Sequence, residues 1–145
     1  MSNLYGFGLS VGLSEEMFED GYQHVTNIDI SFTVVKQMTE MYKERYPTLA
    51  YKQMDVRNIS FPNGTFDAVI DKGTFDSILC GDGSGPNAEQ MLSEIERVLA
   101  PNGVYICVSY GVMTQRMHYF QNSRFEWHVS HHQVTKPTIS TSQAV

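Results

Sequence analysis

The sequence predicts an α/β domain built on a mainly parallel sheet. Three observations indicate this fold. Strand-like and helix-like runs alternate along the chain, several strand-like runs are followed directly by an acidic residue, and the run at 104–108 is almost entirely apolar. Alternating strands and helices favour parallel strands joined by right-handed crossovers. An unbroken apolar strand is typical of a central strand that is covered on both faces.

The elements can be assigned in order from hydrophobic periodicity and from turn residues. A short helix is expected at 13–19 with Ser14 as its N-cap, and a long helix at 31–46 that stops before Pro47. A Gly-rich loop at 81–86 precedes a helix at 87–99, and a short helical piece covers 113–120. The expected strands lie at 25–29, 49–54, 66–71, 104–108 and, as a last candidate, 125–134.

Composition restricts the function classes. The chain has 145 residues, enough for one domain, with 41% hydrophobic and 18% charged residues, which is typical of a globular protein. A net charge of −6 argues against general nucleic-acid binding, because clustered basic residues are needed to neutralise phosphates. No apolar run approaches the ~20 residues of a membrane span, and no signal segment is apparent, so a cytoplasmic location is expected.

Neither cysteines nor histidines form a convincing metal site. Cys80 and Cys107 are far apart in sequence and are expected to be buried thiols. In a strand, His128 and His132 would share a face while His131 points away, and no Cys or acid lies nearby to complete a ligand shell. We therefore expect no metal.

Glycines near the N-terminus and acids at strand ends point to a cofactor crevice. The stretch 6–12, "GFGLSVG", has the glycine spacing of a loop that brings bare backbone close to a ligand. Asp29 follows Gly6 by about 20 residues, where a carboxylate can accept ribose hydroxyls. Asp55, after the next strand, could accept from an exocyclic adenine amine, with Val56 flanking the ring.

The strand-end acids also have simpler interpretations. Asp29 is followed by Ser31 and could cap the long helix, and Asp55 could begin a turn, since aspartate favours both positions. The pattern of alternation and strand-end acids would equally suit a nucleotide-binding Rossmann domain.

Four segments, 27–31, 54–56, 66–76 and 92–103, resemble the class I S-adenosylmethionine-dependent methyltransferases. Within that class they are most similar to the methyltransferase-like 13 group, which includes lysine and N-terminal methyltransferases of translation elongation factor 1A. The block "DKGTFDSILC" is the most specific piece, and the resemblance covers roughly residues 6–137. It implies a Rossmann-like three-layer sandwich over 1–137. The stretch 138–145 is Ser/Thr-rich and without periodicity, so a frayed tail is expected there.

The resemblance also implies a cofactor, S-adenosylmethionine, and the residues that hold it. Gly6 and Gly8 are assigned to the methionine part, Asp29 and Ile30 to the ribose and adenine side, Asp55 and Val56 to adenine, and Lys72 to the pocket wall.

The implied reaction is in-line displacement of the sulfonium methyl by an amine. A lysine amine has an unperturbed pKa of about 10.4, so the site must favour its uncharged form. Asp71 and Asp76 are the candidates for holding that amine. Phe75, Tyr110 and Trp127 could stabilise a cation by cation–π contact, although aromatic side chains more often form core.

The chain departs from the family pattern at both ends. Only Met1–Tyr5 precede the glycines, where the family has an aromatic N-terminal segment and a full first strand. Phe7 and Leu9 replace the Cys and Asn of the family's Gly-Cys-Gly-Asn-Ser loop. The family's sheet ends in an antiparallel hairpin, of which this chain contains only the first arm. A shortened first strand and a missing last strand are therefore expected.

The sequence leaves three functions open. The first is methyl transfer to a protein lysine or N-terminal amine, with an elongation factor 1A-like substrate and with activity impaired by the short ends. The alternative is a non-catalytic binding module that keeps the methyltransferase fold. A small-molecule methyltransferase is the third.

Overall fold

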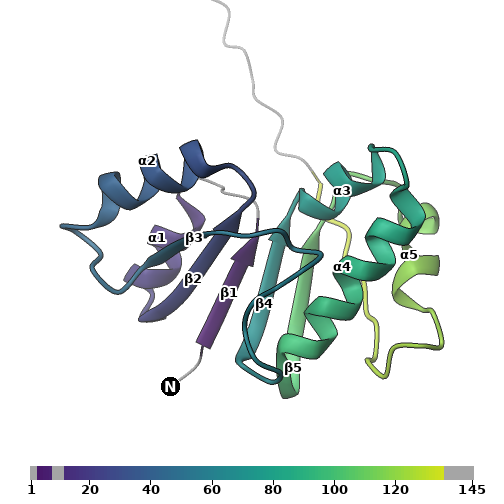
Figure 1. The fold of residues 1–145 in the computed structure, drawn as a ribbon. Coiled ribbons are helices and arrows are strands. Elements are labelled where there is room, and N and C mark those ends of the chain that lie inside the picture. The colour runs from purple at the N-terminus through teal and green to yellow at the C-terminus, as the bar shows by residue number, and fades with distance from the viewer. Residues whose placement is uncertain (1–2, 8–11, 136–145) are drawn as a thin grey trace, which may run out of the picture.

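Five parallel strands form one sheet in the order β3-β2-β1-β4-β5. The computed structural model describes residues 3–7 and 12–135 (Figure 1). The short β1 occupies the centre of the sheet and pairs with β2 on one side and β4 on the other. The strands are β1 (Asn3–Phe7), β2 (His24–Asp29), β3 (Ala50–Gln53), β4 (Phe66–Lys72) and β5 (Leu99–Val108).

Helices cover both faces of this sheet and complete the three layers. Helices α1 and α2 lie over β2 and β3, whereas α3 and α4 lie over β4 and β5, with α5 beside α4 (Figure 1). The helices are α1 (Leu13–Glu19), α2 (Phe32–Tyr42), α3 (Thr74–Leu79), α4 (Ser84–Val98) and α5 (Met113–Phe120). The expected Rossmann-like α/β fold with a mainly parallel sheet is confirmed.

Strand β2 shows how side-chain alternation builds two separate cores. Val25 packs with Met38 and Tyr42 of α2 on one face. Ile28 belongs to the larger cluster on the other face, which includes Leu92 and other residues of α4. Residues an odd number apart on a strand point to opposite faces, so the apolar residues of β2 serve both layers.

The order of the strands reverses direction at β1. The chain moves outward from β1 to β2 and β3, then crosses back to β4 and continues to β5. In a doubly wound sheet this switch point opens a crevice at the carboxyl ends of the strands, where ligands bind. The fold therefore places the ends of β2 and β4, and the segment after β3, around one crevice.

Most predicted elements are confirmed, and five expectations are wrong. Ser14 is not the N-cap of α1, which is Gly12; its hydroxyl donates to Asn27 Oδ1 at 2.7 Å. The glycine-rich loop is shorter than expected, because α4 already begins at Ser84. Cys80 is exposed rather than buried.

The fourth correction concerns β5, which is an edge strand of the described sheet rather than a central one. Its outward-facing residues Val104, Ile106 and Val108 are 53%, 47% and 46% exposed. Within the described ranges, α1 and α2 lie over β2 and β3, so that face of β5 has no helix above it.

The last strand candidate, 125–134, is also not a strand. Phe125 is buried and stacks on Trp127, whose ring lies 6.0 Å from that of Tyr105. The amide of Glu126 donates to Glu96 Oε1 on α4 at 2.9 Å. Aromatic packing and a side-chain acceptor therefore hold this segment on the α4 side as irregular structure.

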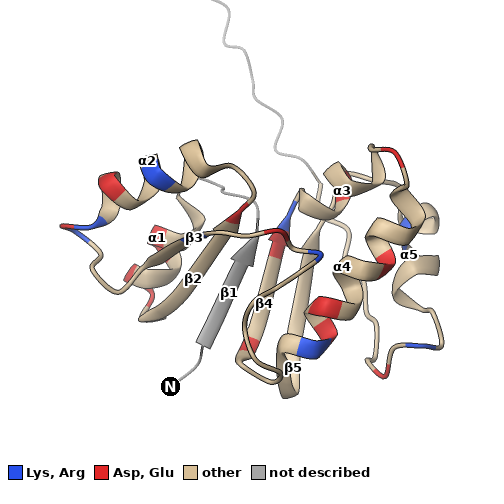
Figure 2. Cartoon of the chain, in the orientation of Figure 1, with Lys and Arg blue, Asp and Glu red and all other residues tan. Residues whose placement is uncertain are grey.

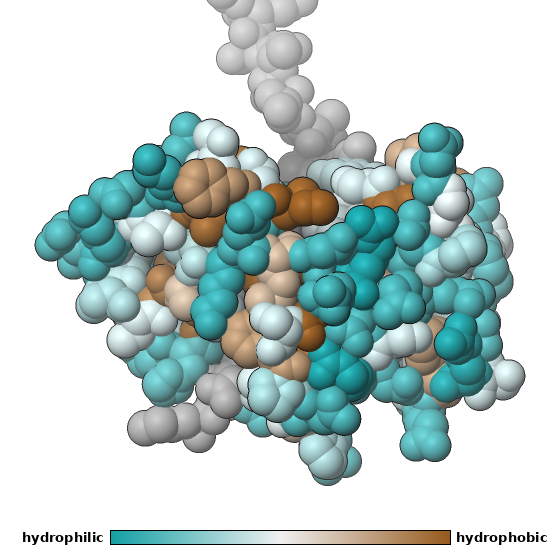
Figure 3. All heavy atoms as spheres, in the orientation of Figure 1, coloured by the Kyte–Doolittle hydropathy of each residue, from teal (hydrophilic) through white to brown (hydrophobic). Residues whose placement is uncertain are grey.

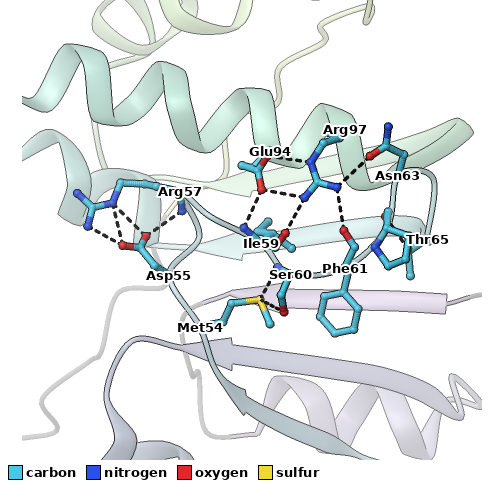
Figure 4. A network of polar contacts seen from close by, with 11 residues as sticks. Met54, Asp55, Arg57, Ile59, Ser60, Phe61, Asn63, Thr65, Glu94 and Arg97 are labelled. Carbon is cyan, nitrogen blue, oxygen red and sulfur yellow. Dashed lines mark hydrogen bonds and ion pairs between the residues drawn. The ribbon is translucent and has the colours of Figure 1, made fainter.

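A half-buried ion pair on α4 holds the long segment 54–65 that crosses from β3 to β4 (Figure 4). The guanidinium of Arg97 donates to the carbonyls of Ile59 and Phe61 at 2.7 and 2.8 Å, and to Glu94 at 2.8 Å. Glu94 Oε2 in turn accepts from the Ile59 amide at 2.7 Å. We call this network the Glu94–Arg97 clamp. It provides hydrogen-bond partners for backbone groups of a segment that lies outside the sheet.

Within residues 3–7 and 12–135, no helix combines the length and the apolar character needed to cross a membrane.

Loss of the clamp should destabilise the fold. Arg97→Ala would remove the donor to the Ile59 and Phe61 carbonyls and break the ion pair of Glu94, which keeps its bond to the Ile59 amide. We therefore expect the free energy of unfolding to fall by about 2–3 kcal/mol. Urea denaturation followed by circular dichroism measures this change. Lys43→Ala, which breaks an exposed pair with Glu40, is the control and should cost about 0–1 kcal/mol.

The clamp should also make stability depend on pH. The hydrogen bond from Arg97 lowers the pKa of Glu94 below its usual value of 4.5, against the opposing effect of burial. Its contribution is therefore present above pH 4.5 and is lost as the pH falls through the lowered pKa. Glu94→Gln should flatten this acid limb, and an unchanged profile would contradict the assignment.

Candidate functional site

A pocket of about 670 Å³ opens at the carboxyl ends of the strands. Its size lies within the usual range for small-molecule sites. Acidic residues lie at the ends of β2 and β4 and in the segment after β3 (Figure 2), and hydrophobic surface gathers between α2 and α3 (Figure 3). The lining residues are Ile28, Asp29, Ile30, Met54, Asp55, Val56, Arg57, Lys72, Gly73, Thr74, Ser77, Ile78, Gly81, Asp82 and Asn87.

The sheet brings together five of the seven residues that the sequence suggested for cofactor binding: Asp29, Ile30, Asp55, Val56 and Lys72. Gly6 lies in β1, where its backbone is in register with Asn27 of β2 and Ile70 of β4. Gly8 falls outside the described residues.

Asp29 ends β2 and plays a local role as well as lining the pocket. Its Oδ1 accepts from the Ser31 amide at 2.7 Å, and Ser31 is the N-cap of α2. Among the described residues, Oδ2 of Asp29 has no hydrogen-bond partner, so one oxygen supports the turn and the other can accept from a ligand. Next to it, Ile30 is 66% exposed at the rim.

Asp55 lies in a half-buried ion pair with Arg57, a residue that the sequence did not single out. The guanidinium Nη2 donates to Asp55 Oδ2 at 2.7 Å, and Nε donates to Oδ1 at 3.0 Å. Hydrogen bonding from Arg57 holds the pKa of Asp55 below its usual range. The spacing Asp-x-Arg after a strand was a possible signal, because an arginine two residues on can fold back on the acid. Val56 between them is buried and lines the pocket.

The opposite wall comes from the start of α3 and of α4. Gly73 has a positive φ of 88° as it leads from β4 into α3, a conformation that favours glycine. Asn87 of α4 also lines the pocket and donates through Nδ2 to the carbonyl of Asp82 at 3.1 Å. Neither Asn87 nor Asp82 was distinguishable in sequence, since Asn and Asp are common in turns and at helix starts whether or not they line a pocket.

Asp71, a catalytic candidate, is fully buried and does not line the pocket. Its Oδ1 accepts from the Thr74 amide at 2.8 Å and its Oδ2 from the Phe75 amide at 3.1 Å, so it caps α3. The Tyr105 hydroxyl donates to the same Oδ2 at 3.2 Å and the Cys107 thiol at 3.6 Å.

Burial sets the protonation of this cluster. Burial raises the pKa of Asp71, opposed by the amide hydrogen bonds. Burial also raises the pKa of Tyr105 well above its usual value and that of Cys107 to about 12. The hydroxyl and the thiol therefore remain protonated and can donate to Asp71.

Asp76, the second catalytic candidate, lies on α3 beside the end of β5. Its Oδ1 accepts from the Ser109 hydroxyl at 2.5 Å and from Arg116 Nε at 3.2 Å, and its Oδ2 from the Tyr110 amide at 2.8 Å. Burial alone would raise the pKa of Asp76, but these hydrogen bonds outweigh it and lower the pKa. Asp76 is therefore an ionised acceptor at neutral pH.

The three aromatic candidates have different environments. Phe75 is fully buried and packs against Tyr119 and Phe120. Trp127 donates Nε1 to the Phe120 carbonyl at 2.8 Å, which is a structural role. Tyr110 is 76% exposed at the end of β5 and is the aromatic side chain that a substrate could reach.

His128, His131 and His132 are all exposed and lie in irregular structure. Within the part of the chain that the structure describes, no group of three or more His, Cys, Asp or Glu side chains could hold a metal ion.

A doubly wound parallel sheet with a pocket at the carboxyl ends of its strands and acids along the rim defines a cofactor-binding domain of the Rossmann-like class. The chain matches the family described as "Methyltransferase domain" over residues 5–107. It therefore belongs to the methyltransferase-domain family, as its sequence motifs predicted.

Named relatives support the finer resemblance to the elongation factor 1A methyltransferase group. The chain is 37% identical over 137 residues to the eEF1A lysine and N-terminal methyltransferase of Mus musculus, which covers 91% of this chain and 19% of that protein. It is 36% identical over 127 residues to the EEF1A lysine methyltransferase 4 of Mus musculus, covering 82% and 49%. The chain thus spans half the length or less of these relatives.

Solved structures confirm the fold. The PH0226 protein from Pyrococcus horikoshii OT3 is 30% identical, with a TM-score of 0.61 over 73% of this chain and 48% of that one. A SAM-dependent methyltransferase from Methanosarcina mazei gives a TM-score of 0.66 at 21% identity, over 82% of this chain and 57% of that one.

Replacing the buried carboxylate should test its structural role. Asp71→Asn turns an amide NH₂ toward the backbone donors of α3, so we expect the free energy of unfolding to fall by about 1–3 kcal/mol. Chemical denaturation measures the loss. Asp20→Asn, at an exposed position, should change stability by less than about 0.5 kcal/mol. Equal effects of the two substitutions would show that Asp71 does not hold α3.

Proposed function

We propose that this chain is an S-adenosylmethionine-dependent methyltransferase that acts on a protein amine, with elongation factor 1A as the acceptor. The single observation that carries the proposal is the pocket, which joins Asp29, Ile30, Asp55, Val56 and Lys72 at the switch point of a methyltransferase-family sheet. The named eEF1A methyltransferase relatives support the acceptor and do not favour a non-catalytic module.

The chemistry of the pocket fits an adenosine cofactor. Asp29 offers a carboxylate oxygen for ribose hydroxyls, and the apolar side chains of Ile28, Val56 and Ile78 can flank a base. Asp55 supplies an acceptor near that base. Bound S-adenosylmethionine would supply an activated methyl on its sulfonium, so the chain needs to align and desolvate the acceptor rather than provide covalent chemistry.

The end of β5 offers a place for the acceptor amine. Asp76 and Tyr110 lie there together, since the Tyr110 amide donates to the Asp76 carboxylate. As an ionised acceptor, Asp76 can orient an incoming amine by hydrogen bonding, while its lowered pKa makes it a weak base, so the proton leaves to solvent. We assign Asp71 a positioning role, because its carboxylate holds the start of α3, which carries Asp76. An elongation factor acceptor would place the chain in the cytoplasm.

Methyl transfer and its dependence on Asp29 test this function. With labelled S-adenosylmethionine and purified elongation factor 1A, the chain should label the factor. Asp29→Ala should weaken cofactor binding by about 1–3 kcal/mol in calorimetry with S-adenosylhomocysteine, because a hydrogen-bond acceptor for the ribose is lost.

Glu40→Gln, which alters an exposed residue of α2, is the control and should leave binding unchanged. A folded chain that gives no heat with S-adenosylhomocysteine would refute cofactor binding. Binding without labelling of elongation factor 1A would instead refute the acceptor and leave the cofactor site standing.

A further inference from the structure

Arg57 links two walls of the pocket through side-chain hydrogen bonds. It lies in the segment that follows β3 and folds back on Asp55 (Figure 4). On its other side, Nη1 donates to Asn87 Oδ1 of α4 at 3.1 Å. Asn87 is itself fixed by its bond to the Asp82 carbonyl. All four residues line the pocket, so this chain of contacts, which we call the Arg57 bridge, joins the segment after β3 to the start of α4 along the pocket wall.

The bridge uses most of the acceptor capacity of Asp55. An ionised carboxylate has about four acceptor positions. The Arg57 amide donates to Oδ1 at 2.8 Å, Nε donates to Oδ1 at 3.0 Å with a longer contact of 3.2 Å to Oδ2, and Nη2 donates to Oδ2 at 2.7 Å. The fork of the guanidinium takes one side of both oxygens and the amide takes the other side of Oδ1. One acceptor position on Oδ2 remains.

This geometry also fixes the plane of the carboxylate. A bidentate arginine pair holds both oxygens at once, whereas lysine would act as a single point charge. The backbone amide adds a third donor, and Asn87 prevents the guanidinium from swinging away. Asp55 therefore presents its remaining acceptor position in one direction.

We propose that Arg57 is a positioning residue that holds Asp55 so that the pocket accepts a 6-amino purine base and rejects a 6-oxo purine. The proposal rests on the proposed function, since it takes the base to be that of the cofactor. A single, fixed acceptor matches one N–H of an exocyclic amine. A 6-oxo purine places a carbonyl oxygen there, and two acceptors facing each other repel.

Without the bridge, Asp55 can rotate to meet a different donor. A 6-oxo purine carries an N1–H, which a mobile carboxylate can reach. Loss of Arg57 should therefore lower the ratio of the affinities for the 6-amino and 6-oxo ligands by a larger factor than it lowers the affinity for the 6-amino ligand.

Calorimetry with S-adenosylhomocysteine and S-inosylhomocysteine measures this preference. We expect the wild-type chain to prefer the adenosyl ligand by about tenfold or more. Arg57→Gln should lower the preference by about tenfold, and Arg57→Lys, which keeps the charge but not the fork, should lie between. Arg124→Gln, which breaks an exposed pair with Glu89 on α4, is the matched control and should keep the wild-type preference.

Each other outcome is informative. If Arg57→Gln weakens both ligands equally, the bridge only supports the fold and the proposal is wrong. If it tightens S-adenosylhomocysteine binding, Arg57 competes with the base for Asp55, which also overturns the proposal. If Arg57→Gln does not fold by circular dichroism, the Lys variant decides. Absence of binding by the folded wild type would refute the proposed function itself, and this inference with it.

Discussion

The buried carboxylate of Asp71 is the interaction on which the carboxyl edge of the sheet depends. It joins three elements at one point, because it lies near the end of β4, accepts from the first amides of α3 and accepts from Tyr105 and Cys107 of β5. A buried acceptor of this kind is costly unless its donors are in place. The start of α3, which forms one wall of the pocket, is thereby fixed relative to the strands.

Three aspartates near this edge have three different environments. Asp71 is buried and holds the start of α3, and Asp55 is held by hydrogen bonds from Arg57. Asp29 accepts from the Ser31 amide with one oxygen, and its other oxygen can accept from a ligand in the pocket. In the proposed function, the same side-chain type would thus hold the fold at Asp71, accept from a base at Asp55 and accept from a ribose at Asp29. Asp76 has a fourth environment, at the end of β5, where hydrogen bonds keep it ionised. The environments of these aspartates differ because each carboxylate accepts from a different number of hydrogen-bond donors.

Much of this could be predicted from the sequence. Alternating runs identified β2, α2, β4 and α4, because the hydrophobic periodicity of these elements is a local signal. The position of Asp29 at a strand end indicated that it lines the pocket, because the carboxyl ends of parallel strands lie at one edge of the sheet. Sequence could not separate Asp71 from Asp29, since burial depends on Tyr105 and Cys107 of a distant strand. It also missed Arg57, whose partner Asn87 lies 30 residues away. The expected strand at 125–134 was wrong because packing of Phe125 and Trp127 onto α4 and β5 decided the backbone instead.

Backbone amide spectra recorded by NMR during addition of S-adenosylhomocysteine would show whether the carboxyl edge of the sheet is a cofactor site. We expect the largest chemical-shift changes at residues that end β2, follow β3 and precede α3, including Asp29, Val56 and Gly73. The amides of β5 residues whose side chains lie on the uncovered face, such as Ile106, should change little. Saturable changes confined to β5 or to α5, with the strand ends unaffected, would contradict this expectation.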